Sequence, residues 1–444
     1  MKKIWNDTRY LLFAGLILRL ALPLVLGTNA YKGDGADYRF HADNLRRYGV
    51  YSGDIGSPPP PTYERMPGVP MEIFLMSSLV NYDSIWMLLP NVIMGWLSLV
   101  LLVGFFKQLK ISGPASMAML WLYALIPVLD YYASQFYPEV PAAFFTLLSL
   151  YIFLVWREKG NLLLLAGIGA ASGMALYFRP ELVLTTGIIG AYFLLKKESL
   201  SVRIKSAAVF ASAVLLVLSP WIIRNARNEG KFIPLGSNQI FDVLETTPDS
   251  ARSCTRGLYA WLNTWHWMER HSKLVAWDFM HVKFTDLPSS AFDSQEEWRQ
   301  ISALQKNKEY NCGIDKALMQ IAGQKRSAHP FRHYVQLPLK RIFFLLFRVE
   351  RFDNFNSDKL PPWMLTFAWI LLTGFGNMMN AVGLFAAWNL RKRNPVFAII
   401  LASAILRLLF FAVVYHVETR YMLILFPEFF IVGTVYLSQR FFGK

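Results

Sequence analysis

Residues 8–40 read TRYLLFAGLILRLALPLVLGTNAYKGDGADYRF, an apolar run that changes abruptly into a polar, acidic segment. About 20 apolar residues are what an α-helix needs to cross the hydrocarbon core of a bilayer. The run Thr8–Thr28 therefore predicts a membrane-spanning helix. Arg19 lies within it and cannot face lipid, so we expect its side chain to snorkel or to turn into the helix bundle.

The composition of the whole chain agrees with a membrane protein. Of 444 residues, 54% are hydrophobic and 17% are charged, and the mean hydropathy is +0.32. This excludes an ordinary soluble globular protein. The net charge is +15, but Lys and Arg concentrate in short connections between apolar runs, as the positive-inside rule predicts for cytoplasmic loops. The basic net charge therefore reflects the membrane topology, and we expect no nucleic-acid partner. Membrane lipids are expected partners, and binding of anionic lipid or phosphate is a secondary interpretation of the charge.

Apolar runs of similar length recur along the chain and predict an all-α polytopic membrane protein with about ten transmembrane helices and both ends in the cytoplasm. The predicted spans are residues 8–28, 84–106, 115–131, 138–156, 162–178, 181–195, 206–223, 364–388, 396–415 and 421–437. The regions are a transmembrane module at 1–223 with its first outer loop at 29–70, a mixed, mainly helical extracytoplasmic region at 224–362, and C-terminal transmembrane helices at 363–444.

Within the region 224–362, helical periodicity with mixed charge covers residues 295–324. The basic, apolar segment 334–347 is predicted to lie at the membrane interface, because a further span would place Arg391 and Arg393 outside the cytoplasm. The two cysteines, Cys254 and Cys312, both fall in this region. Since the extracytoplasmic side is oxidising, we expect a disulfide between them, with two unpaired thiols as the alternative.

Ionisable residues collect at the outer ends of the predicted spans. They are Asp34, Asp37, Glu64, Arg65, Glu139, Arg179, Glu181, Arg224, His416, Glu418 and Arg420. Any one of them could be an ordinary interfacial charge, but the cytoplasmic ends hold almost only Lys and Arg. Carboxylates beside several arginines are suited to activating a nucleophile next to a phosphate group.

The first outer loop carries the most specific spacing. Asp34, Tyr38, Ala42 and Leu45 recur at i, i+4, i+8 and i+11, as on one face of a short helix. Asp34 begins this helix, so its carboxylate either caps the helix or receives the proton of an incoming hydroxyl group.

The pattern Asp34-x-x-x-Tyr38-x-x-x-Ala42-x-x-Leu45, followed by Glu64-Arg65-x-Pro67-Gly68-x-Pro70, resembles the first outer loop of the C-type membrane glycosyltransferases. That family includes the protein O-mannosyltransferases and the lipid A aminoarabinose transferases. Further matches are Tyr137-Pro138-Glu139, Gly173-x-Ala175-x-x-x-Arg179-Pro180, Pro220-Trp221-x-x-Arg224-Asn225, His329-Pro330 and Glu418-x-Arg420-Tyr421.

The resemblance implies transfer of a sugar, with inversion, from a polyprenyl-phosphate carrier to an extracytoplasmic glycolipid, polysaccharide or protein, in a bacterial inner membrane. Asp34 would be the general base, and Glu139 would be a second acidic residue near the site. Arg65 stands where a family member has a lysine that reaches the donor phosphate. One departure is Gly35, where the commonest form has an acid; because Asp37 offers a displaced carboxylate, the choice between Asp34 and Asp37 stays open.

The candidate substrate-binding residues are Tyr38, Glu64, Arg65, Glu139, Arg179, Arg224, His416, Glu418, Arg420 and Tyr421. The leaving phosphate needs cations and the nucleophile needs a base, so the chemistry requires no cofactor, and the sequence has no GxGxxG or P-loop motif. A divalent metal on Glu64 with His266, His271 or His281, or on His416 with Glu418, stays open.

Two other functions fit a polytopic membrane protein. A flippase or transporter of a lipid-linked glycan would have charges near the bilayer midplane and repeated, broken helices. An O-antigen ligase or polymerase would use a diphosphate-linked donor and place its key residues in a late outer loop. The charges at the outer ends of the spans and the absence of an internal repeat in the sequence argue against the flippase. The early position of the Asp34 loop argues against the ligase or polymerase.

Overall fold

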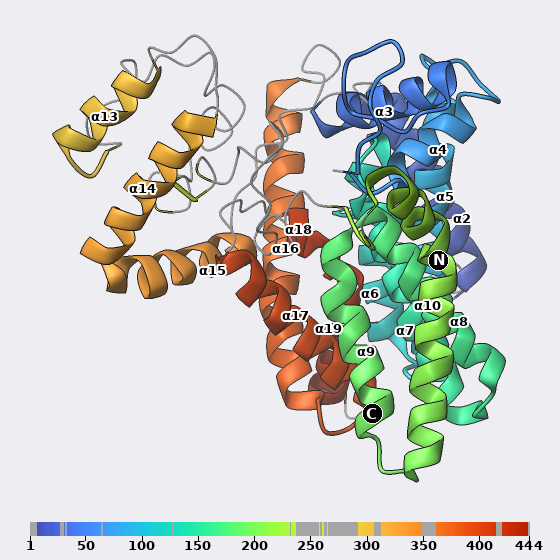
Figure 1. Ribbon diagram of the computed structural model, residues 1–444. Helices are drawn as coiled ribbons and strands as arrows, with labels where there is room; N and C mark the ends of the chain where they lie inside the picture. The colour runs from blue at the N-terminus through green and yellow to red at the C-terminus, as the bar shows by residue number, and fades with distance from the viewer. Residues whose placement is uncertain are drawn as a thin grey trace. The chain divides into compact units, whose positions relative to one another are not determined.

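The computed structural model describes residues 7–26, 31, 33–63, 65–126, 128–230, 232–236, 257, 260–261, 264, 292–305, 312–347, 361–413 and 420–442. The elements in these ranges are all helices. The chain divides into a large unit (Met1–Ser237, Leu346–Leu406 and Thr419–Lys444) and a small unit (Asn238–Leu345 and Arg407–Glu418). Both are drawn in Figure 1.

The large unit is a helix bundle. In its N-terminal part the helices are α2 (Thr8–Leu26), α3 (Asp34–Tyr48), α4 (Gly68–Met76), η1 (Ile85–Leu88), α5 (Leu89–Gln108), α6 (Pro114–Leu125), η2 (Asp130–Ser134), α7 (Glu139–Lys159), α8 (Leu162–Phe178), η3 (Pro180–Leu182), α9 (Val183–Leu195) and α10 (Leu200–Glu229). Towards the C-terminus they are α16 (Pro362–Leu390), α17 (Pro395–Val413), which continues past the end of the unit, α18 (Arg420–Leu423) and α19 (Phe426–Phe442).

The predicted fold class is confirmed: the chain is an all-α, multi-pass membrane protein. In the described part of the chain, seven helices are long and apolar enough to cross a bilayer, and two shorter apolar helices cover 162–178 and 180–195. Each of the ten predicted spans coincides with one of these helices or with α19.

Two predicted spans have different ends in the structure. The helix expected at 115–131 stops at Leu125, and η2 follows after a break. Ile126 leaves the helical region because a residue that precedes a proline avoids helical angles. The last span begins at Phe426 rather than at 421, since Pro427 has no N–H and is best placed in the first turn of a helix.

Small residues let α8 and α10 approach closely. A Cβ atom at Gly169 would lie 2.4 Å from the carbonyl oxygen of Phe210, and one at Gly173 would lie 2.9 Å from Val217. Pairs of glycines four residues apart are typical of close helix packing in membranes, where backbone contact replaces the hydrophobic effect.

Arg19 turns into the bundle, one of the two outcomes expected. Its guanidinium donates to Asp130 at 2.6 Å and to the Gly15 carbonyl at 3.1 Å, and its side chain is fully buried. Gly95 makes room for this pair, because a Cβ there would lie 2.3 Å from Asp130 Oδ1. We call Arg19 and Asp130 the buried pair.

The helices α3 and α4 pack on each other at one end of the large unit (Figure 1). Their shared core consists of Tyr38, Ala42, Val69, Ile73, Met87, Leu88 and Phe136. Two of the four positions predicted for the inner face of α3, Tyr38 and Ala42, belong to it. This core fixes the first outer loop on the membrane helices.

The small unit contains α13 (Gln295–Gln305), α14 (Cys312–Ala328), the π-helix η7 (Arg332–Gln336) and most of α15 (Leu337–Phe347). The buried indole of Trp261 donates to Glu297 at 2.9 Å, and Lys325 donates to the same carboxylate at 2.7 Å. The helical periodicity predicted at 295–324 is confirmed for 295–305 and 312–324, and the residues between them lie outside the described ranges. The segment 334–347 is helical, and its place at the membrane interface stays a prediction.

Candidate active site

The turn before α3 delivers Asp34. Gly33 has a φ of +58°, which favours glycine, and a Cβ atom there would lie 3.0 Å from the hydroxyl of Tyr137. Asp34 is the first residue of α3, but no side-chain hydrogen bond caps the helix. The N-cap position belongs to Gly33, and the Asp34 carboxylate is directed to arginine side chains.

Two arginines hold the Asp34 carboxylate. Arg420 Nη2 donates to Oδ2 at 2.6 Å, and Arg65 Nη2 lies 3.4 Å from Oδ1. The Asp34 side chain is 15% exposed. These contacts bring together the first outer loop and the start of α18, which the sequence separates by almost the whole chain.

Arg65 links the two candidate bases. Its Nε donates to Asp37 at 2.7 Å, and its guanidinium lies over the ring of Tyr38, 5.4 Å from the centroid. Burial raises the pKa of Tyr38 above its ordinary value. The phenol therefore stays protonated near neutral pH, so Tyr38 supports Arg65 and is not itself a base.

The first residue of α7, Glu139, completes the site. Its buried carboxylate accepts a hydrogen bond from Arg179, and Arg420 Nε lies 3.7 Å from the same oxygen. Arg179 also approaches Glu181 at 3.6 Å and lies over the ring of Tyr421. We call Asp34, Asp37, Arg65, Glu139, Arg179, Glu181 and Arg420 the arginine–carboxylate cluster.

The comparisons with known proteins found one family match and similar solved structures. Residues 64–223 match the family described as "Dolichyl-phosphate-mannose-protein mannosyltransferase". The match covers 160 of the chain's 444 residues and is a similarity to that family. A crystal structure of ArnT from Cupriavidus metallidurans in the apo state is similar over 95% of this chain and 76% of that chain, at 13% sequence identity and a TM-score of 0.41. No curated protein matches the chain.

The family match spans Arg65, Glu139 and Arg179, ends one residue before Arg224, and begins after the first helix of the outer loop. The candidate bases Asp34 and Asp37 therefore lie outside the matched region, as does Arg420. Of the arginines that contact these two carboxylates, only Arg65 lies within it.

Sequence reasoning missed His41 as a neighbour of Asp37. Its Nδ1–H donates to the Asp37 carbonyl at 2.9 Å and lies 3.6 Å from the carboxylate. Burial lowers the pKa of His41 despite the nearby carboxylate, so the ring is neutral near pH 7. The i, i+4 spacing of Asp37 and His41 on α3 was the signal that could have revealed this contact.

Arg224, a candidate substrate-binding residue, contacts backbone carbonyls in the structure. Its guanidinium donates to the carbonyls of Thr62 at 2.6 Å and Tyr51 at 2.7 Å. Tyr51 in turn donates from its hydroxyl to the Arg65 carbonyl at 3.0 Å. These bonds connect Arg224 to the backbone that presents Arg65, and its direct contact with a phosphate stays a prediction.

Several predicted features lie outside the described residues. They are Glu64, His416 and Glu418, the histidines at 266, 271 and 281, and the side chains of Cys254 and Cys312. The predictions of a disulfide and of a metal on those residues stay open. The residues that the structure does describe contain no group of three or more His, Cys, Asp or Glu that could hold a metal ion.

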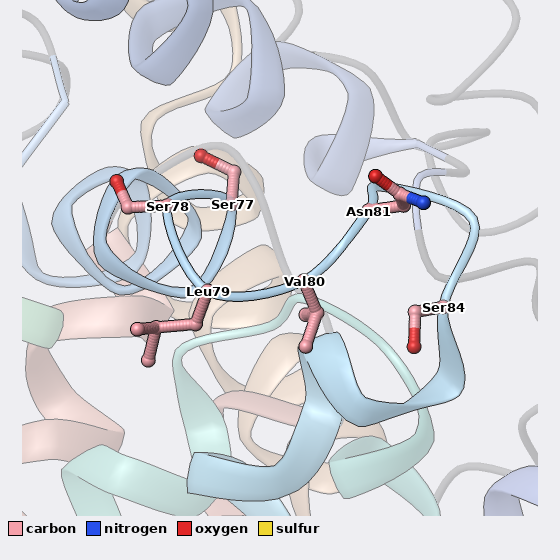
Figure 2. A pocket seen from close by; sticks show the side chains of 6 residues that line it. All are labelled: Ser77, Ser78, Leu79, Val80, Asn81 and Ser84. Atoms are coloured by element: carbon pink, nitrogen blue, oxygen red, sulfur yellow. The ribbon is translucent and has the colours of Figure 1, made fainter.

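An open pocket of about 400 Å³ lies in the connection between α4 and η1. Figure 2 shows the hydroxyls of Ser77 and Ser78 directed to one side of this connection and the side chains of Leu79 and Val80 to the other. Ser77, Ser78, Leu79, Val80, Asn81 and Ser84 line it. None of these residues carries a charge, whereas the arginine–carboxylate cluster combines carboxylates with arginines and remains the candidate active site.

Proposed function

We propose that the protein is an inverting glycosyltransferase that moves a sugar from a polyprenyl-phosphate carrier to an acceptor on the extracytoplasmic side of a bacterial inner membrane. The observation that carries the proposal is the contact of the Asp34 carboxylate with Arg420 and Arg65 at the start of α3. It joins a base and two cations at a single point.

The three arginines of the cluster suit a phosphate leaving group. Arg65, Arg179 and Arg420 present planar guanidinium groups, which bind phosphate oxygens through paired hydrogen bonds. Their side chains are only 11–26% exposed. Charge interactions are stronger there than in bulk water, so the arginines would stabilise the negative charge that develops on the departing phosphate.

Asp34 would act as the general base. The acceptor hydroxyl gives its proton to the Asp34 carboxylate while its oxygen forms a bond to the anomeric carbon of the donor sugar. The bond from that carbon to the phosphate oxygen breaks, and polyprenyl phosphate leaves with the electron pair. Attack from the face opposite the phosphate inverts the anomeric configuration.

The donor is a lipid, and the site suits such a molecule. Apolar helices flank the cluster, so the polyprenyl chain can lie along the bundle while its phosphate reaches the arginines. The acceptor class stays open between glycolipid, polysaccharide and protein. The reaction as proposed needs no nucleotide and no metal.

The test is release of polyprenyl phosphate by the purified protein from a panel of polyprenyl-phosphate sugars, with a crude extracytoplasmic glycan extract as the acceptor source. We expect one donor to be consumed. Asp34→Asn should lower the rate by about 100-fold or more, the loss expected when a general base is removed.

The matched control is Asp43→Asn, the same change on the same helix. Asp43 accepts from Tyr82 and pairs with Arg39, away from the cluster, so its loss should change the rate by less than about threefold. Turnover of a diphosphate-linked glycan, with no monophosphate donor consumed, would contradict the proposal and favour a ligase or flippase.

A further inference from the structure

Arg420 contacts two carboxylates of the cluster at once. Its Nη2 donates to Asp34 at 2.6 Å, and its Nε lies 3.7 Å from Glu139. The guanidinium also lies over the ring of Tyr137, 4.7 Å from the centroid. The planar guanidinium group can shift parallel to the ring of Tyr137 at small cost. Arg420 can therefore move between the carboxylates of Asp34 and Glu139.

The contact between Arg420 and Asp34 works against catalysis. A carboxylate that holds a guanidinium accepts a proton less readily, because the nearby positive charge favours the ionised form. The short bond to Arg420 also occupies the oxygen that would receive the proton of the acceptor. Asp34 is therefore a poor base while its carboxylate is bonded to Arg420. We call Asp34 in this state masked.

Glu139 can receive Arg420 when it leaves Asp34. Only one of its oxygens, Oε1, has a hydrogen bond, from Arg179. The other, Oε2, is buried and has no hydrogen-bond partner among the residues that the structure describes. A buried carboxylate oxygen without a donor is costly, so a second guanidinium bond there would be favourable.

Building on the proposed function, we propose that donor binding unmasks the base. The donor phosphate draws Arg420 away from Asp34 onto itself and onto Glu139. Asp34 then becomes able to take the proton of the acceptor hydroxyl only when a donor is bound. Glu139 acts as a positioning residue that holds the displaced arginine, and the donor binds before the acceptor reacts.

This competition predicts the direction in which a substitution of Asp34 changes the affinity for phosphate. If phosphate and Asp34 compete for Arg420, removing the carboxylate must strengthen phosphate binding. We therefore expect Asp34→Asn to bind a short-chain prenyl monophosphate about tenfold tighter than the wild type, the change that corresponds to about 1.4 kcal/mol. The measurement is isothermal titration calorimetry on the full chain in detergent at one ionic strength.

A double-mutant cycle separates competition from long-range electrostatics. Loss of any negative charge near a phosphate favours binding, but only the competition passes through Arg420. In the Arg420→Gln background, Asp34→Asn should therefore change the affinity no more than Asp43→Asn does in the wild type. Asp34→Ser provides the same cycle should the Asn variant fold poorly, which thermal unfolding of each variant checks.

Three outcomes are informative. Tightening by Asp34→Asn that disappears without Arg420 supports the proposal. Equal or weaker binding by Asp34→Asn, or tightening that persists without Arg420, overturns the unmasking while leaving the glycosyltransferase reaction intact. If the wild type binds no prenyl monophosphate at all, the proposed function and the inference fail together.

Discussion

Two sets of charged residues in the large unit use the same chemistry in different ways. The buried pair joins one arginine to one aspartate, with side-chain exposures of 0% and 2%. The arginine–carboxylate cluster has four carboxylates for three arginines, and its members keep up to 30% of their side-chain surface exposed. The first arrangement is closed, whereas the second has open positions for a further anion.

This difference shows how a membrane protein can use one set of charged residues for stability and another for reactivity. In the buried pair, Arg19 donates to Asp130 and to the carbonyls of Gly15 and Ala124, which fastens the start of η2 to α2. In the cluster, Arg420 divides its contacts between Asp34 and Glu139, so no partner holds it exclusively. The cluster is therefore partly open to solvent, whereas the buried pair is not.

The largest expected effect comes from breaking the buried pair. Arg19→Met leaves the Asp130 carboxylate buried without a counter-charge, which costs about 3–5 kcal/mol of folding stability. We expect a large fall of the melting temperature in detergent, measured by thermal unfolding.

Adding Asp130→Asn to Arg19→Met removes the unpaired charge and should restore most of the lost stability. The matched comparison is Asp34→Asn, which leaves Arg420 with Glu139 and should change the melting temperature by about 2 °C or less. Equal loss of stability in both variants would show that the two sets are not different in kind.

The sequence predicted the bundle well, because long apolar runs bounded by Lys and Arg determine where helices cross a membrane. It also indicated that Asp34, Arg65, Glu139, Arg179 and Arg420 would gather at the outer ends of the spans. The family match supports the glycosyltransferase class. The assignment of Asp34 as base stays a prediction.

The pairings within the cluster could not be predicted. Spacing along the sequence orders residues within one helix, whereas the contact of Arg420 with Asp34 depends on how α18 and α3 pack. For the same reason Arg224, which looked equivalent to the other arginines, lies on the carbonyls of Tyr51 and Thr62. Tertiary structure decides which arginines remain available to a ligand.

The large unit also contains a buried carboxyl group that has no arginine partner among the described residues. Glu72 on α4 is buried, and neither of its carboxyl oxygens has a hydrogen-bond partner in the described part of the chain. Burial raises the pKa of Glu72 to about 8 from its usual 4.5. The folded protein therefore keeps this proton up to about pH 8, while the unfolded chain loses it near pH 4.5.

The sign of the pH dependence follows from these two values. Folding costs nothing extra at this residue below the unfolded pKa, and the cost grows as the pH rises from about 4.5 to 8, where it levels off. Glu72→Gln removes that cost. We expect its melting temperature to exceed that of the wild type by about 3–5 °C at pH 8 and by about 1 °C or less at pH 5. A difference that does not change with pH would mean that Glu72 is ionised in the folded protein.

The smallest effect is expected for Asp37→Asn, the change that decides between the two candidate bases. Asp37 is 30% exposed against 15% for Asp34, and its guanidinium contact is with Arg65 alone among the described ion pairs of the cluster. Its role would be to orient Arg65 towards the donor phosphate. The loss should therefore be less than about tenfold and should raise the KM for the donor more than it lowers kcat. Asp34→Asn should instead lower kcat, because the base acts in the transition state.

If Asp37→Asn abolishes turnover and Asp34→Asn does not, Asp37 is the base, and the bond between Asp34 and Arg420 is structural like that of the buried pair.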